Sequence, residues 1–217
     1  MYLPPFYPIL DTEAAARKSC PIEALAEALL DAGAKILQFR HKGHYSRAVF
    51  EQAERIAALC RMADALPVID DRADIALLLS AGLHLGQDDL APSAARRLTG
   101  EHTILGFSTH NESQLMAAAA EPADYLAIGP IFSTGSKRNP DAVVGVEELR
   151  RLRPLVRAPL VAIGGIDRSN AAAVLAAGAD SVAVIADLYP DSMDPASLRA
   201  RASEWMKVTG REAPMLE

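Results

Sequence analysis

Short runs of β-forming residues alternate along the chain with longer segments rich in Ala, Leu and Arg, and no other feature constrains the fold as strongly. We expect strands at Phe6–Leu10, Lys35–Phe39, Pro67–Asp70, Leu83–Leu85, Thr103–Phe107, Tyr125–Ile128, Leu160–Ile163 and Val182–Ile185. We expect helices at Pro21–Ala32, Tyr45–Ala63, Arg72–Ser80, Pro92–Leu98, Glu112–Ala120, Val146–Leu155, Arg168–Ala177 and Pro195–Lys207. Apolar residues recur in several of these segments with the spacing of one helix face, as at Ile22, Leu25, Ala26 and Leu29.

Strict alternation of strand and helix predicts an α/β fold with a parallel sheet, because right-handed crossovers put a helix between successive strands. Eight such units favour a closed, eight-stranded (β/α)8 TIM barrel over an open sheet. A typical barrel of this kind has about 250 residues, so a chain of 217 residues leaves little room for a second domain. We therefore expect a single barrel domain over residues 1–217, with a frayed tail at 208–217.

The charge balance excludes one large class of function. The chain carries 28 acidic and 22 basic residues, a formal net charge of −6 at pH 7. Such a chain lacks the generally electropositive surface of a nucleic-acid-binding protein. It contains no apolar run long enough to span a membrane, and its first ten residues show no signal-peptide pattern. We expect a cytoplasmic protein that binds neither nucleic acid nor membrane, and the sequence leaves a homo-oligomer open.

Polar residues gather after the expected strands, at the end of the barrel where such folds carry their reactive groups. Gly164 and Gly165 follow the seventh expected strand, and Ile185-Ala186 end the eighth strand before a short helix. Glycines let the backbone approach an anion closely, and N–H groups at a helix start complement its charge. These two loops therefore predict a phosphate site. The alternative is that the glycines serve only a tight turn.

Asp71 and Asp89 form a second candidate group, because they follow neighbouring strands. One or two carboxylates, completed by water and substrate phosphates, are typical of a Mg²⁺ site. Zinc is disfavoured because no cluster of Cys and His accompanies them. Taken singly, each Asp is better explained as the cap of the helix that follows it. Taken together, and beside Arg40 and Lys42, they predict a metal site.

Arg40, Lys42 and Lys137 form a candidate cationic group. Arg offers a planar fork and Lys a mobile charge, and both suit diphosphate oxygens. Ordinary surface charge is the alternative, but Arg40 continues the inward alternation of Gln38 and is hard to bury without an anion. We therefore expect the mouth of the barrel to be cationic although the chain as a whole is acidic.

Two histidines need separate interpretations. His84 lies in an expected strand between Leu83 and Leu85, which favours a core or supporting role. His110 follows the end of the fifth strand and is a candidate acid or base. His110 could equally cap the helix that Asn111 opens.

Several motifs occur in a fixed order from about Ile36 to Ile185. They are Gln38-Phe39-Arg40-His41-Lys42, Ile69-Asp70-Asp71-Arg72, His84-Leu85-Gly86-Gln87-Asp88-Asp89, Gly106-Phe107-Ser108-Thr109-His110, Gly129-Pro130-Ile131-Phe132-Ser133-Thr134-Gly135-Ser136-Lys137, Ala162-Ile163-Gly164-Gly165-Ile166 and Gly178-Ala179-Asp180. Together they resemble the thiamine-phosphate synthase family. The two-glycine motif also occurs in other phosphate-binding barrels, whereas the ensemble is much more specific.

The resemblance implies a transferase that joins 4-amino-2-methyl-5-(diphosphooxymethyl)pyrimidine to a thiazole phosphate, with or without a carboxylate. Its products would be thiamine phosphate and diphosphate. By the same resemblance, the pyrimidine diphosphate would be held by Gln38, Arg40, Lys42, Asp70, Ser108 and Lys137, of which Arg40, Lys42, Ser108 and Lys137 would also act in catalysis. The thiazole phosphate would be held by Thr134, Ser136, Gly165, Ile185 and Ala186. The expected cofactor is Mg²⁺, bound by Asp71 and Asp89.

The chain departs from the family pattern at two positions that bear on affinity. Asp70 stands where the family usually has Asn, and Ala186 stands where it usually has Ser. A carboxylate accepts hydrogen bonds but does not donate them when ionised, so Asp70 should repel a diphosphate unless it shares the metal or has a raised pKa. Two alternatives remain beside the synthase interpretation. One is a thiazole tautomerase of the same barrel family that uses His110 as acid and base, and the other is a non-catalytic sensor of a phosphorylated ligand.

Overall fold

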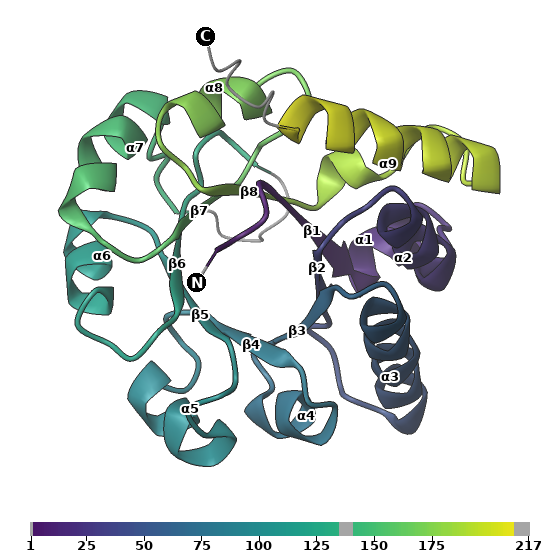
Figure 1. The fold of residues 1–217 in the computed structure, drawn as a ribbon, viewed down its shortest axis with the longest axis horizontal. Coiled ribbons are helices and arrows are strands. Elements are labelled where there is room, and N and C mark those ends of the chain that lie inside the picture. The colour runs from purple at the N-terminus through teal and green to yellow at the C-terminus, as the bar shows by residue number, and fades with distance from the viewer. Residues whose placement is uncertain (1, 135–140, 211–217) are drawn as a thin grey trace, which may run out of the picture.

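The strands form one closed, all-parallel barrel in the order of the sequence, with β1 next to β8. Residues 2–134 and 141–210 are described in a computed structural model. Figure 1 looks along the barrel and shows the ring of strands with the helices around it. The strands are β1 (Phe6–Asp11), β2 (Ile36–Arg40), β3 (Leu66–Asp70), β4 (Gly82–Leu85), β5 (Leu105–Thr109), β6 (Tyr125–Ile128), β7 (Leu160–Ile163) and β8 (Ser181–Val184). The predicted (β/α)8 TIM barrel is confirmed.

The helices cover the outside of the barrel. They are α1 (Thr12–Arg17), α2 (Ile22–Asp31), α3 (Arg47–Met62), α4 (Ala73–Leu78), α5 (Pro92–Thr99), α6 (Glu112–Ala118), α7 (Val146–Leu152), α8 (Ala171–Ala176) and α9 (Pro195–Thr209), with short 3-10 turns η1 (Arg153–Leu155) and η2 (Ala186–Leu188). Among the described residues, no helix is long and apolar enough to cross a membrane.

Two strand boundaries differ from the prediction in ways that affect the site. Strand β5 begins and ends two residues later than expected, so that Ser108 lies within the strand and not in the loop after it. Strand β8 ends at Val184, so that Ile185 already belongs to the turn that leads into η2. In both cases the residue is held by barrel geometry at the C-terminal end of its strand.

Helix α1 was not predicted. Asp11, the last residue of β1, begins this helix by accepting a hydrogen bond from the backbone N–H of Ala14 at 2.7 Å. A side-chain oxygen at this position satisfies one of the N–H groups that every helix start leaves open. The helix has only six residues, too few for apolar periodicity to reveal it.

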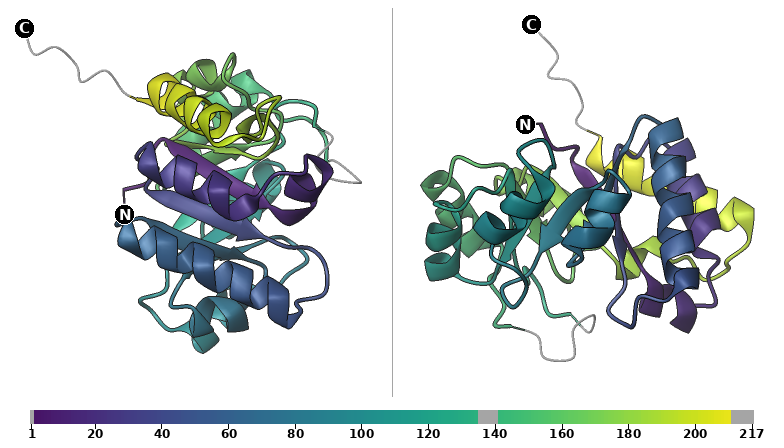
Figure 2. Two further views of the ribbon diagram at one scale, coloured as in Figure 1. Left: turned by 90° about the vertical axis from the view of Figure 1, so that its right-hand side faces the viewer. Right: turned by 90° about the horizontal axis from the view of Figure 1, so that it is seen from below.

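The core has two layers, one inside the barrel and one between the strands and the helices. Side chains from alternate strand positions fill the barrel interior, among them Tyr7, Ile9 and Tyr125. The outer layer includes Trp205 of α9, which is fully buried and stacks on Phe6 with ring centroids 5.0 Å apart. Figure 2 shows α9 beside α2, where the two helices contact each other.

The chain end differs in part from the expected tail. Helix α9 continues to Thr209, whose side chain is buried and donates a hydrogen bond to the Trp205 carbonyl at 2.8 Å. Residues 208 and 209 therefore belong to the barrel, and the rest of the expected tail from 211 onward lies outside the described residues.

Candidate active site

A cavity of about 610 Å³ opens at the C-terminal ends of the strands. This volume is in the range that holds a small-molecule ligand. The predicted site residues that line it are Gln38, Arg40, Lys42, Asp70, Asp71, Asp89, Ser108, Thr134, Gly165, Ile185 and Ala186. The barrel thus brings together residues from seven of its strands, β2 to β8, and the loops that follow them. Ser136 and Lys137 lie outside the described residues.

Arg40 reaches into this cavity from the end of β2 and is held by two carboxylates. Its guanidinium contacts Asp11 closely, and its Nε lies 3.4 Å from Asp70 Oδ2. The anion that we expected Arg40 to need is therefore supplied by carboxylates of the chain itself. Sequence reasoning missed Asp11, because its pairing with Arg40 depends on the register of β1 against β2.

Lys42 extends from the loop after β2 to the two carboxylates that end β3. Its ammonium lies 2.9 Å from Asp70 Oδ2 and also contacts Asp71. Burial lowers the pKa of Lys42, but the charges and hydrogen bonds of Asp70 and Asp71 outweigh burial, and the pKa is raised. Lys42 is therefore a fixed cation at neutral pH, and it is already paired with carboxylates.

Asp70 is almost fully buried, with 5% of its surface exposed. Burial raises its pKa, because removal from water disfavours the charged form. Lys42 and Arg40 lower the pKa but do not cancel the effect of burial. Asp70 thus lies between the two predicted diphosphate-binding cations.

Asp71 and Asp89 do not cap helices, so that alternative is wrong. The caps of α4 and α5 are Arg72 and Ala91, and neither helix has a side-chain cap. Instead, Asp89 Oδ2 accepts a hydrogen bond from the Gly86 N–H at 2.7 Å. Asp71 has a left-handed backbone, with φ of +61°, which costs an L-residue energy and is frequent at functional sites.

The two carboxylates face each other closely enough to interact. Burial raises the pKa of Asp89, and the neighbouring Asp71 carboxylate raises it further. Asp71 Oδ1 is buried and has no hydrogen-bond donor among the described residues. No group of three or more His, Cys, Asp and Glu side chains in that part of the chain is arranged to hold a metal. The pair fits a cation that takes one or two carboxylates and completes its coordination with other oxygens.

A chain of hydrogen bonds crosses the barrel interior beneath the cavity. Gln38 Nε2 donates to the Tyr7 hydroxyl at 3.0 Å, which lies 2.8 Å from the Tyr125 hydroxyl. The Tyr125 hydroxyl lies 3.1 Å from His84 Nδ1, and His84 Nε2 lies 2.8 Å from Ser108 Oγ. This network joins Gln38 and Ser108, two residues predicted to bind the same substrate, through side chains of β1, β6 and β4.

The Gln38 amide donates to the Tyr7 hydroxyl, and each of the other three hydrogen bonds joins two groups that can both donate and accept. Burial lowers the pKa of His84 to about 4, so the ring is neutral, and one of its nitrogens donates while the other accepts. In either tautomer His84 Nε2 holds the Ser108 hydroxyl at the wall of the cavity. His84 has the supporting role that its strand position indicated.

The loops after β7 and β8 line a second cavity of about 520 Å³, which shares Thr134, Gly165, Ile185 and Ala186 with the first. Gly165 has φ of +64°, and a Cβ at this position would lie 2.6 Å from the Ser133 carbonyl oxygen. The glycine therefore serves a close approach between two loops and leaves its backbone open to the cavity. A tight turn alone does not account for it.

His110 also lines the first cavity, and it does not cap α6. Asn111 caps this helix through a hydrogen bond from the Gln114 N–H at 2.9 Å. The His110 ring places Nδ1 2.7 Å from the Gly129 carbonyl oxygen and 3.5 Å from Asp141 Oδ2. Its role as an acid or base stays a prediction.

The described lining differs from the expected cationic mouth. Two cationic side chains, Arg40 and Lys42, share the first cavity with five acidic ones, Asp70, Asp71, Asp88, Asp89 and Asp141. Lys137, the third expected cation, lies outside the described residues. The described part of the mouth is therefore rich in acid, and its two cations are paired.

The comparison with known families agrees with this arrangement. The sequence pattern described as thiamine monophosphate synthase matches residues 6–188, which include every strand of the barrel. The chain belongs to the thiamine monophosphate synthase family.

Individual relatives extend the match over nearly the whole chain. The thiamine-phosphate synthase of Koribacter versatilis is 44% identical over 95% of this chain and 96% of its own length. That of Chloroflexus aurantiacus is 40% identical over 88% and 89%. The solved structure of thiamine phosphate pyrophosphorylase from Pyrococcus furiosus is 33% identical, with a TM-score of 0.81 over 95% of this chain and 96% of that one. The chain is an enzyme of the thiamine-phosphate synthase type, which favours this interpretation over a non-catalytic sensor.

Proposed function

We propose that the enzyme joins 4-amino-2-methyl-5-(diphosphooxymethyl)pyrimidine to a thiazole phosphate, with or without a carboxylate, and releases diphosphate, together with CO2 when the thiazole carries the carboxylate. The bond between the pyrimidine methylene and the diphosphate oxygen breaks, and the thiazole nitrogen forms a bond to the same methylene carbon. The main support is the division of one cavity into an end with Arg40 and Lys42 and an end formed by the loops at Gly165 and Ala186. Two differently phosphorylated substrates need such a pair of ends.

The reaction needs charge stabilisation more than a nucleophilic side chain. Negative charge grows on the diphosphate as it leaves, and fixed cations beside it lower the barrier. Arg40 and Lys42 both form ion pairs with Asp70 and therefore lie close to each other. Both stay charged at neutral pH. We assign Lys137 the same role on the strength of the family motif. The barrel holds both substrates at attack distance, which removes much of the entropic cost of bringing them together.

The hydrogen-bond network supports a role for Ser108 and Gln38 in holding the pyrimidine diphosphate. His84 Nε2 holds the Ser108 hydroxyl at the wall of the cavity, where it can form a hydrogen bond with a ligand oxygen. Thr134, Ser136, Gly165 and the backbone at Ile185-Ala186 are assigned to the thiazole phosphate. Ala186 has no hydroxyl to offer, so this position contributes its backbone N–H alone.

The carboxylate pair supports Mg²⁺ as the cofactor. Asp71 and Asp89 would hold the ion, since one Asp71 oxygen is buried without a donor among the described residues and the Asp71 carboxylate raises the pKa of Asp89. The ion, when bound, would neutralise diphosphate charge. Arg40 and Lys42 then need to orient the substrate and need not carry its whole charge.

One assay tests the proposal. Purified enzyme, both phosphorylated heterocycles and Mg²⁺ should yield thiamine phosphate and diphosphate in equal amounts, detected by mass spectrometry. Wild-type enzyme that forms neither product would refute the synthase reaction. Omitting one heterocycle at a time is the control for hydrolysis of the diphosphate.

A second experiment tests the metal site. The Asp71→Ala, Asp89→Ala double variant should lose about 100-fold or more in rate, because it removes both proposed protein ligands. Asp74→Ala is the matched control, since among the residues that the structure describes this exposed carboxylate on α4 forms an ion pair with Arg72 alone. Full activity in the double variant would refute the metal assignment while leaving the reaction itself intact.

A further inference from the structure

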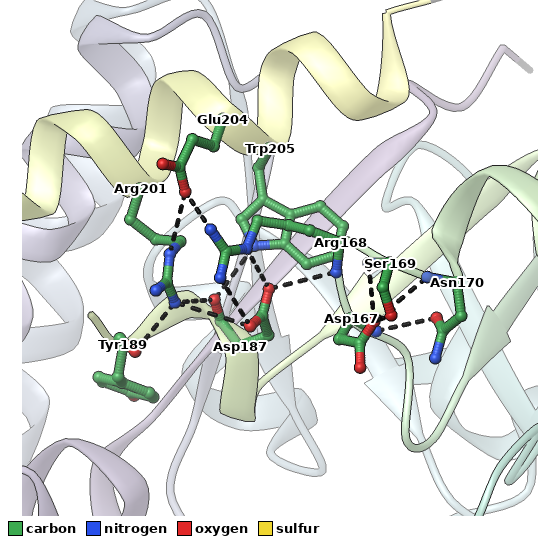
Figure 3. A network of polar contacts seen from close by, with 9 residues as sticks. All are labelled: Asp167, Arg168, Ser169, Asn170, Asp187, Tyr189, Arg201, Glu204 and Trp205. Atoms are coloured by element: carbon green, nitrogen blue, oxygen red, sulfur yellow. Dashed lines mark hydrogen bonds and ion pairs between the residues drawn. The ribbon is translucent and has the colours of Figure 1, made fainter. Parts of the chain in front are cut away.

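Arg168 connects the two loops to which the thiazole phosphate is assigned. It lies in the loop after β7, and its Nε donates to Asp187 Oδ2, in η2 after β8, at 2.8 Å (Figure 3). The backbone N–H of Arg168 donates to the same oxygen at 3.3 Å. The guanidinium also contacts Glu204 of α9 closely. One side chain therefore holds both loops and the last helix.

Helix α9 fixes the backbone of Asp187 from the other side. Arg201 donates to the Asp187 carbonyl oxygen at 2.7 Å, and Trp205 Nε1 donates to the same oxygen at 3.2 Å. Arg201 Nε also lies 3.4 Å from Glu204 Oε2. Figure 3 shows the four charged groups stacked between η2 and α9. The main chain of Asp187 is thus anchored independently of its carboxylate.

The charges in this network balance, with Arg168 and Arg201 against Asp187 and Glu204. The balance matters because Asp187 lines the same cavity as Gly165 and Ala186. A phosphate carries negative charge into that cavity. An unpaired carboxylate in the lining would repel it, whereas a carboxylate paired with Arg168 repels it much less.

We propose that Arg168 is a positioning residue that keeps the Asp187 carboxylate paired and so sets the affinity of the enzyme for its thiazole phosphate. This inference rests on the proposed function, since it needs the phosphate of that substrate to bind between the loops after β7 and β8. Arg168 itself is absent from the lining of both cavities, so it acts through Asp187.

The direct test measures binding of the thiazole phosphate by the fluorescence of Trp205. This residue is the single tryptophan of the chain and donates a hydrogen bond to the Asp187 carbonyl oxygen. We expect Arg168→Ala to raise the dissociation constant about tenfold, equal to about 1.4 kcal/mol. Asp187→Asn in the Arg168→Ala background should return the constant to within about threefold of wild type, because it removes the excess negative charge that the loss of Arg168 leaves beside Arg201. Calorimetric titration of the same variants checks that the optical signal reports binding.

Kinetics separate this role from a general loss of structure. Arg168→Ala should raise KM for the thiazole phosphate about tenfold and leave KM for the pyrimidine diphosphate unchanged. Arg151→Ala is the matched control, because Arg151 also pairs with two carboxylates, Glu112 and Glu148, but lies on α7 away from both cavities. Arg168→Gln keeps hydrogen-bonding capacity without the charge and should behave as Arg168→Ala does.

The outcomes distinguish this inference from the function on which it rests. If wild-type enzyme neither binds nor consumes the thiazole phosphate, the proposed function is wrong. If wild type binds it and Arg168→Ala binds it equally well, the inference about Arg168 is wrong. Failure of Asp187→Asn to restore binding would also overturn it, since loop linkage and not charge pairing would then be what Arg168 provides.

Discussion

Replacing Gly165 by alanine should weaken both the fold and the binding of the thiazole phosphate. The position has φ of +64°, where an L-residue costs roughly 1–2 kcal/mol. A Cβ there would also lie 2.6 Å from the Ser133 carbonyl oxygen and 2.7 Å from Phe132 Cβ. Because backbone atoms cannot rotate away as a flexible side chain can, this overpacking adds about 1–3 kcal/mol. The expected loss in the free energy of unfolding is therefore about 2–5 kcal/mol.

Gly100→Ala supplies the matched control. Gly100 also has a positive φ, +79°, and its ψ of 175° puts it in a region that is essentially limited to glycine, where the backbone strain is about 1–3 kcal/mol. A Cβ there would meet no atom within 4 Å, so no overpacking adds to this strain. For a domain of this size, 1 kcal/mol shifts Tm by about 2–4 °C. We expect Gly165→Ala to unfold roughly 10 °C below wild type and Gly100→Ala roughly 5 °C below it, as measured by calorimetry.

Steady-state kinetics complete the test. Gly165→Ala should raise KM for the thiazole phosphate about tenfold or more, because its loop must shift to relieve the contact. Gly100→Ala should leave both KM values as in wild type, since it lies at the end of α5 and outside both cavities. Equal Tm and equal KM values in the two variants would refute the argument that the close approach at Gly165 shapes the phosphate end.

Two further variants probe the other end of the cavity. Burial raises the pKa of Asp70 above 3.8, so its ionisation costs stability, and the wild type should lose stability as pH rises from about 4 through the raised pKa. Asp70→Asn should lack this loss in denaturant titrations across pH and should lower KM for the pyrimidine diphosphate, and an unchanged pH profile would contradict the assignment. Tyr125→Phe should cost about 1–3 kcal/mol of stability by leaving His84 Nδ1 and Tyr7 without their shared partner. It should also raise KM for the pyrimidine diphosphate about threefold, and an unchanged KM would show that Ser108 needs no such support.

The barrel could be predicted from sequence because local patterns determine most of it. Strands β6 and β7 have the predicted bounds, since each is a short apolar run between clear turn signals. The cavity residues could also be predicted in part, because parallel strands bring their C-terminal ends together whatever the side chains between them. The order of the strands along the chain was therefore enough to predict that Gln38, Asp71 and Ser108 lie in one cavity.

Contacts between distant strands could not be predicted in the same way. The Tyr7–Tyr125 hydrogen bond joins residues 118 positions apart, and nothing in either strand marks its tyrosine as anything but core. The pairing of Asp11 with Arg40 depends on barrel register, and Arg168 with Asp187 looks like ordinary surface charge. Each of these contacts follows from the closed barrel and not from local sequence.

The acid-rich lining changes what the cations can do by themselves. Arg40 and Lys42 are both paired with carboxylates, and the five acidic side chains around the cavity outnumber them. A diphosphate entering this cavity competes with Asp70 for both cations, so the positive charge of Arg40 and Lys42 is not free to offset the negative charge of the diphosphate. Additional positive charge must arrive with the substrate or from Lys137. This is the physical reason to expect that the pyrimidine diphosphate binds with Mg²⁺. In a titration with diphosphate alone, binding should be weak without Mg²⁺ and at least tenfold tighter with it, and equal affinity under both conditions would contradict this reasoning.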